Sequence, residues 1–239
     1  MNYIYIGAKK MKPVNLVFLS TVDSTNTYAK QNIDALTLPS LVVADRQTAG
    51  RGRHGKSFYS PDKTGLYMTL VYEAPDECEL ITPAAAVAVC SALEDFGIKP
   101  QIKWVNDVYI GGLKVCGILT ECFLHNGKRY IALGVGINLT TKDFPSDIPN
   151  PGSVNIDCNK SELALAVSEK FLSLTDSKSI VSEYEKRLFV IGKEVTYIKN
   201  GTEFTATVKG INSLCNLTVC RSDGTEEILS SGEISIKMR

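Results

Sequence analysis

The sequence has few metal-binding and disulfide-forming signals. It contains two histidines, His54 and His125, and its seven cysteines never form a Cys-x-x-Cys pair. Structural zinc sites need closely spaced histidine and cysteine ligands, so the pattern argues against one. An odd, scattered set of cysteines without a signal peptide is typical of reduced thiols, and we expect a cytoplasmic protein.

The chain also lacks a long apolar run and an excess of either charge. The longest apolar stretch, residues 83–93, contains Ser91 and stops at Glu94, which is too short to span a membrane. Lys and Arg number 26, as do Asp and Glu. A neutral molecule has no general attraction for nucleic acid, so we expect no DNA partner and only local recognition of phosphate.

The 239 residues fit one sizeable domain and a small second one. Hydrophobic periodicity predicts a buried strand at 14–20, a helix from 23 to about 32, strands at 41–45, 65–73, 101–110, 113–124 and 128–139, and helices at 82–97 and within 160–188, with a break near 176–177. From about residue 191, short β-like runs separated by turn sequences predict a barrel-like module of roughly five strands. Residues 1–12 read as an extension.

A glycine-rich basic loop covers residues 50–57, GRGRHGKS. It fits both the dinucleotide fingerprint and the Walker A pattern, but each requires a long helix directly afterwards. Pro61 and Gly65 interrupt any such helix, which disfavours both. A solvated surface loop remains one alternative. The other is a flexible loop that closes on a phosphorylated ligand, with glycine N–H groups and arginine side chains facing it.

Gly111 and Gly112, between two β-rich runs, predict a two-residue hairpin turn. In that register Asp107 lies opposite Cys116, and Asp107 and Lys114 become diagonal neighbours on one face. An exposed ion pair is the ordinary outcome, but the apolar flanks favour a cleft. Trp104 is expected in the core, and Asn106 could be no more than a turn residue.

Several segments together resemble the biotin–protein ligase family: DSTN at 23–26, residues 47–61, KWVND at 103–107, residues 113–121, GVGINL at 134–139 and residues 231–237. The resemblance runs from about residue 14 to the end of the chain. It implies an α+β fold, with a class II synthetase-like catalytic domain (1–188) of mixed sheet and packed helices, and a C-terminal SH3-like β-barrel (189–239).

The resemblance also implies a ligase that activates biotin with ATP as biotinyl-AMP and transfers it to a lysine of a biotin carboxyl carrier protein, with Mg²⁺ assisting. The implied catalytic residues are Lys114, Asp107 and Arg51. The implied biotin contacts are Ser24, Thr25, Asn26, Gln47, Gly50, Arg51, Gly52, Arg53, Lys114 and Gly117. The implied adenylate contacts are Arg53, Lys56, Phe58, Asn106, Asn138 and Lys237. No metal ligand is assigned.

The sequence departs from the family pattern at a few places. Val105 stands where proline is usual, Phe58 where tryptophan is frequent, and His54 and Lys56 where arginines are frequent. Because DSTN begins at residue 23, we expect no N-terminal DNA-binding domain. The alternatives are a lipoate or octanoate ligase or transferase on the same scaffold and a non-catalytic biotin-binding regulator. The sequence leaves monomer and homodimer both open.

Overall fold

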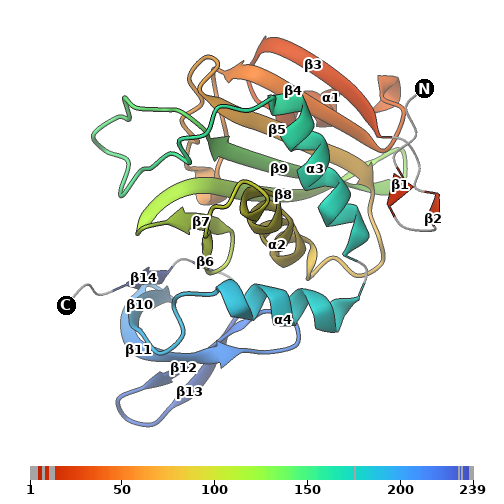
Figure 1. Cartoon of the computed structure of the whole chain (residues 1–239). Helices are drawn as coiled ribbons and strands as arrows, with labels where there is room; N and C mark the ends of the chain where they lie inside the picture. The colour runs from red at the N-terminus through yellow and green to blue at the C-terminus, as the bar shows by residue number, and fades with distance from the viewer. Residues whose placement is uncertain are drawn as a thin grey trace.

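A computed structural model describes residues 5–6, 9–10, 14–174, 176–230, 232 and 234–236. Its centre is a seven-stranded mixed sheet of order β3-β4-β5-β9-β8-β7-β6 (Figure 1). The strands are β3 (Asn15–Val22), β4 (Ser40–Gln47), β5 (Gly65–Glu73), β6 (Gln101–Lys103), β7 (Asp107–Ile110), β8 (Leu113–His125) and β9 (Lys128–Asn138). Only β3 and β4 pair in parallel. The expected α+β architecture is confirmed.

Helices cover both faces of this sheet. Helices α2 (Ile81–Glu94) and α3 (Lys160–Ser173) pack on one face, and α1 (Thr25–Gln31) packs on the other against β4, β5 and β9 (Figure 1). The main core lies under α2, whose side chains are buried nearly all round. A smaller apolar cluster lies under α1. The expected helices are confirmed, including the break before α4 (Ser177–Arg187).

The start of α1 follows from its sequence. Ser24 has an extended backbone, and its side chain accepts a hydrogen bond from the backbone N–H of Thr27, which caps the helix. Asn26, in the first turn, is buried at 3% exposure and points onto the sheet. The capping residue therefore also sets the position of a predicted site residue.

The C-terminal module is a five-stranded antiparallel sheet of order β13-β12-β11-β10-β14. Its strands are β10 (Glu194–Lys199), β11 (Thr202–Ile211), β12 (Leu217–Arg221), β13 (Glu226–Leu229) and β14 (Ile234–Ile236). It lies beside α4 at one end of the larger domain (Figure 1). Trp104 is buried as expected, and its indole N–H donates to the Cys215 carbonyl at 2.9 Å, which ties the two parts together.

Two predictions about strands are wrong. Residues 14–20 were expected to form a buried strand, but β3 is the sheet edge, and Phe18 on it is 50% exposed. In the hairpin, a β-bulge between Val108 and Tyr109 shifts the register, so Asp107 lies opposite Gly117. Cys116 pairs with Val108 instead and is fully buried in the core.

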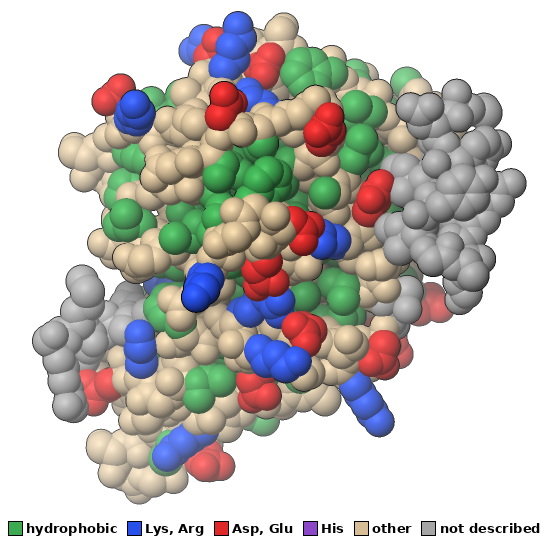
Figure 2. Space-filling view, in the orientation of Figure 1, with side chains coloured by type: hydrophobic (Ala, Val, Ile, Leu, Met, Phe, Trp, Pro, Cys, Tyr) green, Lys and Arg blue, Asp and Glu red, His purple; other side chains and the backbone are tan. Residues whose placement is uncertain are grey.

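Two short strands, β1 (Tyr5–Ile6) and β2 (Lys9–Lys10), pair within the N-terminal extension, where the sequence pattern predicted none. Within the described ranges, no helix is both long and apolar enough to cross a membrane. On the face seen in Figure 2, acidic and basic side chains are interspersed, as the balanced composition suggests.

Candidate functional site

Three glycines form a bare strip on the α1 face of the central sheet. Gly117 on β8 and Gly136 on β9 are cross-strand partners. A Cβ at Gly136 would lie 2.4 Å from Cε1 of Phe58, and one at Gly117 would lie 3.2 Å from Cε2 of the same ring. A Cβ at Gly134 would lie 2.4 Å from Oδ1 of Asn26. These glycines therefore leave room for the Phe58 ring and the Asn26 amide to lie against the sheet.

A buried polar network lies beside this strip. Gln47 Oε1 accepts from the backbone N–H of Thr25 at 2.9 Å, and Gln47 Nε2 donates to the Ser60 hydroxyl at 2.9 Å. The Thr69 hydroxyl lies 2.8 Å from Oγ1 of Thr25 and 2.5 Å from Oδ1 of Asn26. Three predicted biotin contacts thus converge from α1 and β4. Such satisfied networks hold buried side chains in one orientation.

Glu121 joins this network from β8. It accepts from Asn26 Nδ2 and from Lys30 Nζ, each at 2.9 Å, and its Oε1 lies 3.3 Å from Nη1 of Arg51. Burial alone would raise the pKa of this carboxyl, but the hydrogen bonds from Asn26 and Lys30 and the charges of Lys30 and Arg51 outweigh it and lower the pKa. Glu121 is therefore ionised at neutral pH.

Lys114 and Asp107 form an ion pair at the end of the strip, with Lys114 Nζ 2.7 Å from Asp107 Oδ1. Both side chains are mostly shielded, at 31% and 19% exposure. The bulge places Gly117 opposite Asp107, so the ion pair and the glycine strip share one face. The expected proximity of these two charges is confirmed, although its register is not the predicted one.

Arg53 and Asn106 bring the glycine loop to the same end of the site. Arg53 Nη1 donates to Asn106 Oδ1 at 3.0 Å and to the Gly232 carbonyl at 3.4 Å. Asn106 Nδ2 donates to the Ile118 carbonyl at 2.9 Å, which fixes the amide orientation. Arg53 therefore links the loop, the segment before β7 and the C-terminal module.

Asn138, at the end of β9, has one amide atom engaged and one free. Its Nδ2 donates to the Gly152 carbonyl at 3.0 Å, while its buried Oδ1 has no hydrogen-bond partner within the described part of the chain. A buried acceptor without a partner is costly, so a donor group of a ligand fits there.

The glycine loop is a compact hairpin. Arg51 and Ser57 form an antiparallel bridge, and the Gly52 N–H donates to the Lys56 carbonyl at 2.7 Å. Arg53–Gly55 form one 3₁₀ turn, and the next regular element is β5, so no α-helix follows the loop. The rejection of both helix-dependent phosphate motifs is confirmed.

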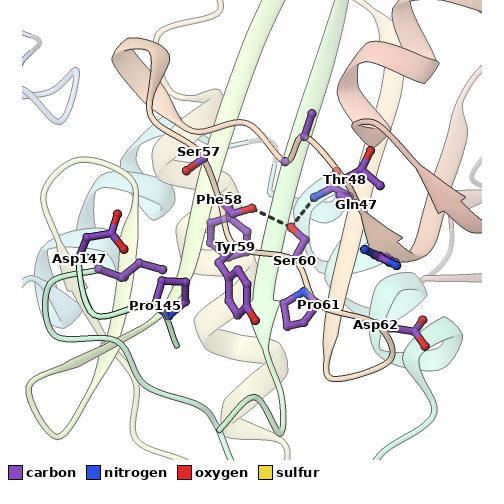
Figure 3. A pocket seen from close by; sticks show the side chains of 14 residues that line it. Gln47, Thr48, Ser57, Phe58, Tyr59, Ser60, Pro61, Asp62, Pro145 and Asp147 are labelled. Carbon is purple, nitrogen blue, oxygen red and sulfur yellow. Dashed lines mark hydrogen bonds between the residues drawn. The ribbon is translucent and has the colours of Figure 1, made fainter. Parts of the chain in front are cut away.

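A cavity of about 480 Å³ opens between this loop and the segment around residue 147 (Figure 3). Gln47, Gly50 and Phe58 are among its lining residues, together with Pro145 and Ile148. The Ser60 hydroxyl accepts from Gln47 Nε2 and donates to the Phe58 carbonyl, which holds the segment that follows the glycine loop (Figure 3).

A smaller cavity of about 190 Å³ lies where the larger domain meets the C-terminal module. Arg53, Val105 and Leu214 are among its lining residues. Arg53 thus belongs to the glycine loop and also lines this junction, which makes the C-terminal module part of the surroundings of the site.

The structure brings most of the predicted site residues to one face of the sheet. Lys237 lies outside the described residues. Sequence reasoning missed Thr69, Ser60 and Glu121. Glu121 could have been found from alternation, because it lies two positions past Leu119 and four past Gly117 on β8 and so shares their face. Within the described residues, no group of three or more His, Cys, Asp or Glu side chains could hold a metal ion.

The fold and the site together define an α+β ligand-binding domain joined to a small β module, and comparison with known proteins agrees. The "Biotin/lipoate A/B protein ligase family" matches residues 18–138, and the "Biotin protein ligase C terminal domain" matches residues 190–237. The chain belongs to the biotin protein ligase family.

Individual relatives cover different shares of the chain. A "Biotin--[acetyl-CoA-carboxylase] ligase" of Paracoccus denitrificans is 32% identical over 65% of this chain and 68% of its own length. The "Bifunctional ligase/repressor BirA" of Salmonella typhimurium is 28% identical over 93% of this chain and 74% of its own. The protein of the same name from Bacillus subtilis is 39% identical, but the matched part spans only 42% of its length.

Among solved structures, "Biotin protein ligase from Aquifex aeolicus in complex with biotin and ATP" superposes with a TM-score of 0.79 at 27% identity. The match covers 94% of this chain and 99% of that one.

Proposed function

We propose that this protein is an ATP-dependent ligase that converts biotin to biotinyl-5′-AMP and transfers the biotinyl group to a lysine of a biotin carboxyl carrier protein. The observation that carries the proposal is the glycine strip, against which the Phe58 ring lies, together with the Lys114–Asp107 ion pair at its end. Family membership across both parts of the chain supports the same activity.

In the first half-reaction the biotin carboxylate attacks the α-phosphorus of ATP, and pyrophosphate leaves. Negative charge from the carboxylate and the phosphate then accumulates in one place. Lys114, Arg51 and Arg53 supply positive charge there, and Lys114 is already oriented by Asp107 at 2.7 Å. Charges placed before the reaction stabilise a transition state without reorganising during it.

In the second half-reaction the amine of the acceptor lysine attacks the carbonyl carbon of the mixed anhydride, and AMP leaves. The amine must first lose a proton from its ammonium form. Asp107 is the carboxylate at this end of the strip, and it would attract the ammonium and take up the proton. No covalent bond to the enzyme forms, and no histidine lies among the residues assigned to the site.

Magnesium enters the proposal as part of the ATP substrate. Mg²⁺ commonly keeps several waters and binds substrate phosphates with one or two carboxylates at most. Among the described residues no cluster of metal-ligating side chains offers an alternative. We therefore assign the ion to the triphosphate and assign no side chain to it.

We assign biotin to the region beside Ser24, Thr25, Gln47 and the glycine loop, and its approach to Gly117 requires the Phe58 ring, which lies against that glycine, to move. We assign the nucleotide to the region of Asn138, Asn106, Lys56 and Phe58, with Lys237 approaching from the C-terminal module. The free Oδ1 of Asn138 supports the second assignment.

The decisive experiment mixes the protein with ATP, Mg²⁺, biotin and a purified carboxyl carrier domain, and measures pyrophosphate release and acceptor mass separately. We expect biotin-dependent pyrophosphate release and a mass gain of one biotinyl group on one lysine. Parallel reactions with lipoate and octanoate test the rival activity, for which we expect no acyl transfer. Release of pyrophosphate with lipoate but not with biotin would refute the proposal.

A further inference from the structure

Glu121 occupies a central position between two parts of the site that approach from different elements. It lies on the glycine-strip face of β8, opposite Ala132 of β9. Its Oε2 accepts from Asn26 of α1, and its Oε1 lies near both Lys30 of α1 and Arg51 of the glycine loop. One side chain therefore connects the sheet, the helix and the loop.

The contact with Asn26 sets the direction of the Asn26 amide. Its Nδ2 donates to Glu121 Oε2 at 2.9 Å and to the Leu119 carbonyl at 3.3 Å, while its Oδ1 lies 2.5 Å from the Thr69 hydroxyl. Rotating the Asn26 amide by a half-turn would put its NH₂ group where Oδ1 now lies. That position is close to the Gly134 backbone, since a Cβ built on Gly134 would lie 2.4 Å from Oδ1. Both ends of the amide are engaged within the protein, so Asn26 acts as a support for its neighbours.

The contact with Arg51 sets the direction of a loop side chain. Arg51 is 46% exposed, and a long exposed side chain samples many rotamers unless something holds it. The Glu121 carboxylate, 19% exposed, supplies a fixed partner at 3.3 Å. Glu121 is held by Asn26 and Lys30, so the arginine is tied to a rigid group.

We infer that Glu121 is a positioning residue for the adenylation step: it holds the Arg51 guanidinium beside its own carboxylate, on the glycine-strip face of the sheet, before substrate arrives. This inference rests on the proposed function and deepens it. Glu121 does not touch the substrates. Its carboxylate is the counter-charge that allows two cations, Lys30 and Arg51, to lie near the same oxygen atom.

Removing the charge has a definite consequence. In Glu121→Gln the side chain keeps its shape and an acceptor oxygen for Asn26, but it no longer balances Lys30 and Arg51. The two cations then repel, and the more exposed one, Arg51, turns toward water. Biotin binding must then order the Arg51 side chain again, so we expect the biotin KM to rise roughly tenfold. This value is at the low end of the range for a charge-assisted hydrogen bond, because Arg51 in the Glu121–Arg51 pair is about half exposed.

The test is a double-mutant cycle on pyrophosphate release, with biotin binding measured by calorimetry in parallel. Glu121→Gln is made in the wild-type and Arg51→Ala backgrounds. Glu183→Gln on α4 is the matched control, because Glu183 also pairs with two cations, Lys186 and Arg187. We expect Glu121→Gln to raise the biotin KM and Kd roughly tenfold in wild type and less than about threefold beside Arg51→Ala. The rate at saturating biotin should stay near wild type, as should every kinetic and binding parameter of the control.

A second variant separates positioning from helix packing. Lys30→Met removes the competing cation and keeps the Glu121–Arg51 pair, so we expect a biotin KM within about twofold of wild type. A tenfold rise in Lys30→Met would mean that Glu121 acts by holding α1, which overturns the inference. Equal effects of Glu121→Gln in both backgrounds also overturn it. An inactive wild type would contradict the proposed function instead.

Discussion

Gly50 is the position where adding one methyl group should damage the site most directly. A Cβ there would lie 2.4 Å from the Phe58 carbonyl, 2.7 Å from Ser60 Oγ and 3.1 Å from Gln47 Nε2. The first contact involves backbone, and the Phe58 N–H also donates to the Gly50 carbonyl at 2.9 Å, so Phe58 cannot move aside without breaking that bond. Gly50→Ala must therefore spread the loop and disturb Gln47.

The size of the effect follows from the cost of overpacking, about 1–3 kcal/mol. Since about 1.4 kcal/mol corresponds to a factor of ten, we expect the biotin KM to rise roughly tenfold or more. Pyrophosphate release measured against biotin concentration gives the KM, and thermal unfolding checks that the protein remains folded. The strain is local to the loop, so the Tm should fall by only a few degrees.

Gly52→Ala is the matched control in the same loop. Its Cβ would meet nothing closer than the Lys56 carbonyl at 3.3 Å, and the Gly52 backbone has an ordinary φ of −117°. We expect its biotin KM to change less than about threefold. If both variants behave alike, or if Gly50→Ala retains the wild-type KM, the loop is not held as described.

Further outcomes follow from the charged residues. Lys114→Ala should raise the activation barrier for pyrophosphate release by about 3–4 kcal/mol. Asp107→Asn should slow acceptor labelling more than pyrophosphate release. Equal losses in both steps for both variants would argue against separate roles. Arg53→Ala should release the adenylate tenfold to a hundredfold faster and label bystander proteins, and a variant that labels nothing would rule out this retention role. Glu121 has a lowered pKa when folded, so its stabilisation is present at neutral pH and is lost as the pH falls through that pKa. The Tm difference between wild type and Glu121→Gln should therefore shrink from pH 7 to pH 4, and a constant difference would contradict the assignment.

Much of the fold could be predicted because its signals are local. The all-round apolar run of α2 and the Gly111-Gly112 turn each depend on a few adjacent residues, and the structure confirms both. The exposed edge position of β3 could not be predicted, because whether an apolar strand is central or at an edge depends on the order of strands in the sheet. Phe18 is exposed for that reason.

The site residues could be predicted where they belong to one sequence motif, but not where only the order of strands in the sheet brings them together. Lys114 and Asp107 are close in sequence, so one hairpin brings them together. Glu121 meets Asn26 across 95 positions of sequence, and Thr69 meets it across 43. No pattern within a single segment indicates such contacts, because they depend on which strands become neighbours and which faces they present.

The bulge in the β7–β8 hairpin limits how the length of this region can vary. Val115 and Cys116 are both buried although they are consecutive, and beyond them β8 alternates regularly, with Gly117 and Glu121 toward the site and Ile118 toward the core. The bulge takes up Val115 as an extra residue, because Lys114 pairs with Tyr109 and Cys116 pairs with Val108. Removing Val115 would leave both pairs in regular register, whereas removing one residue between Gly117 and Glu121 would exchange the faces of part of β8. Single-residue deletions in this hairpin should therefore be tolerated at the bulge and not in the regular part of β8.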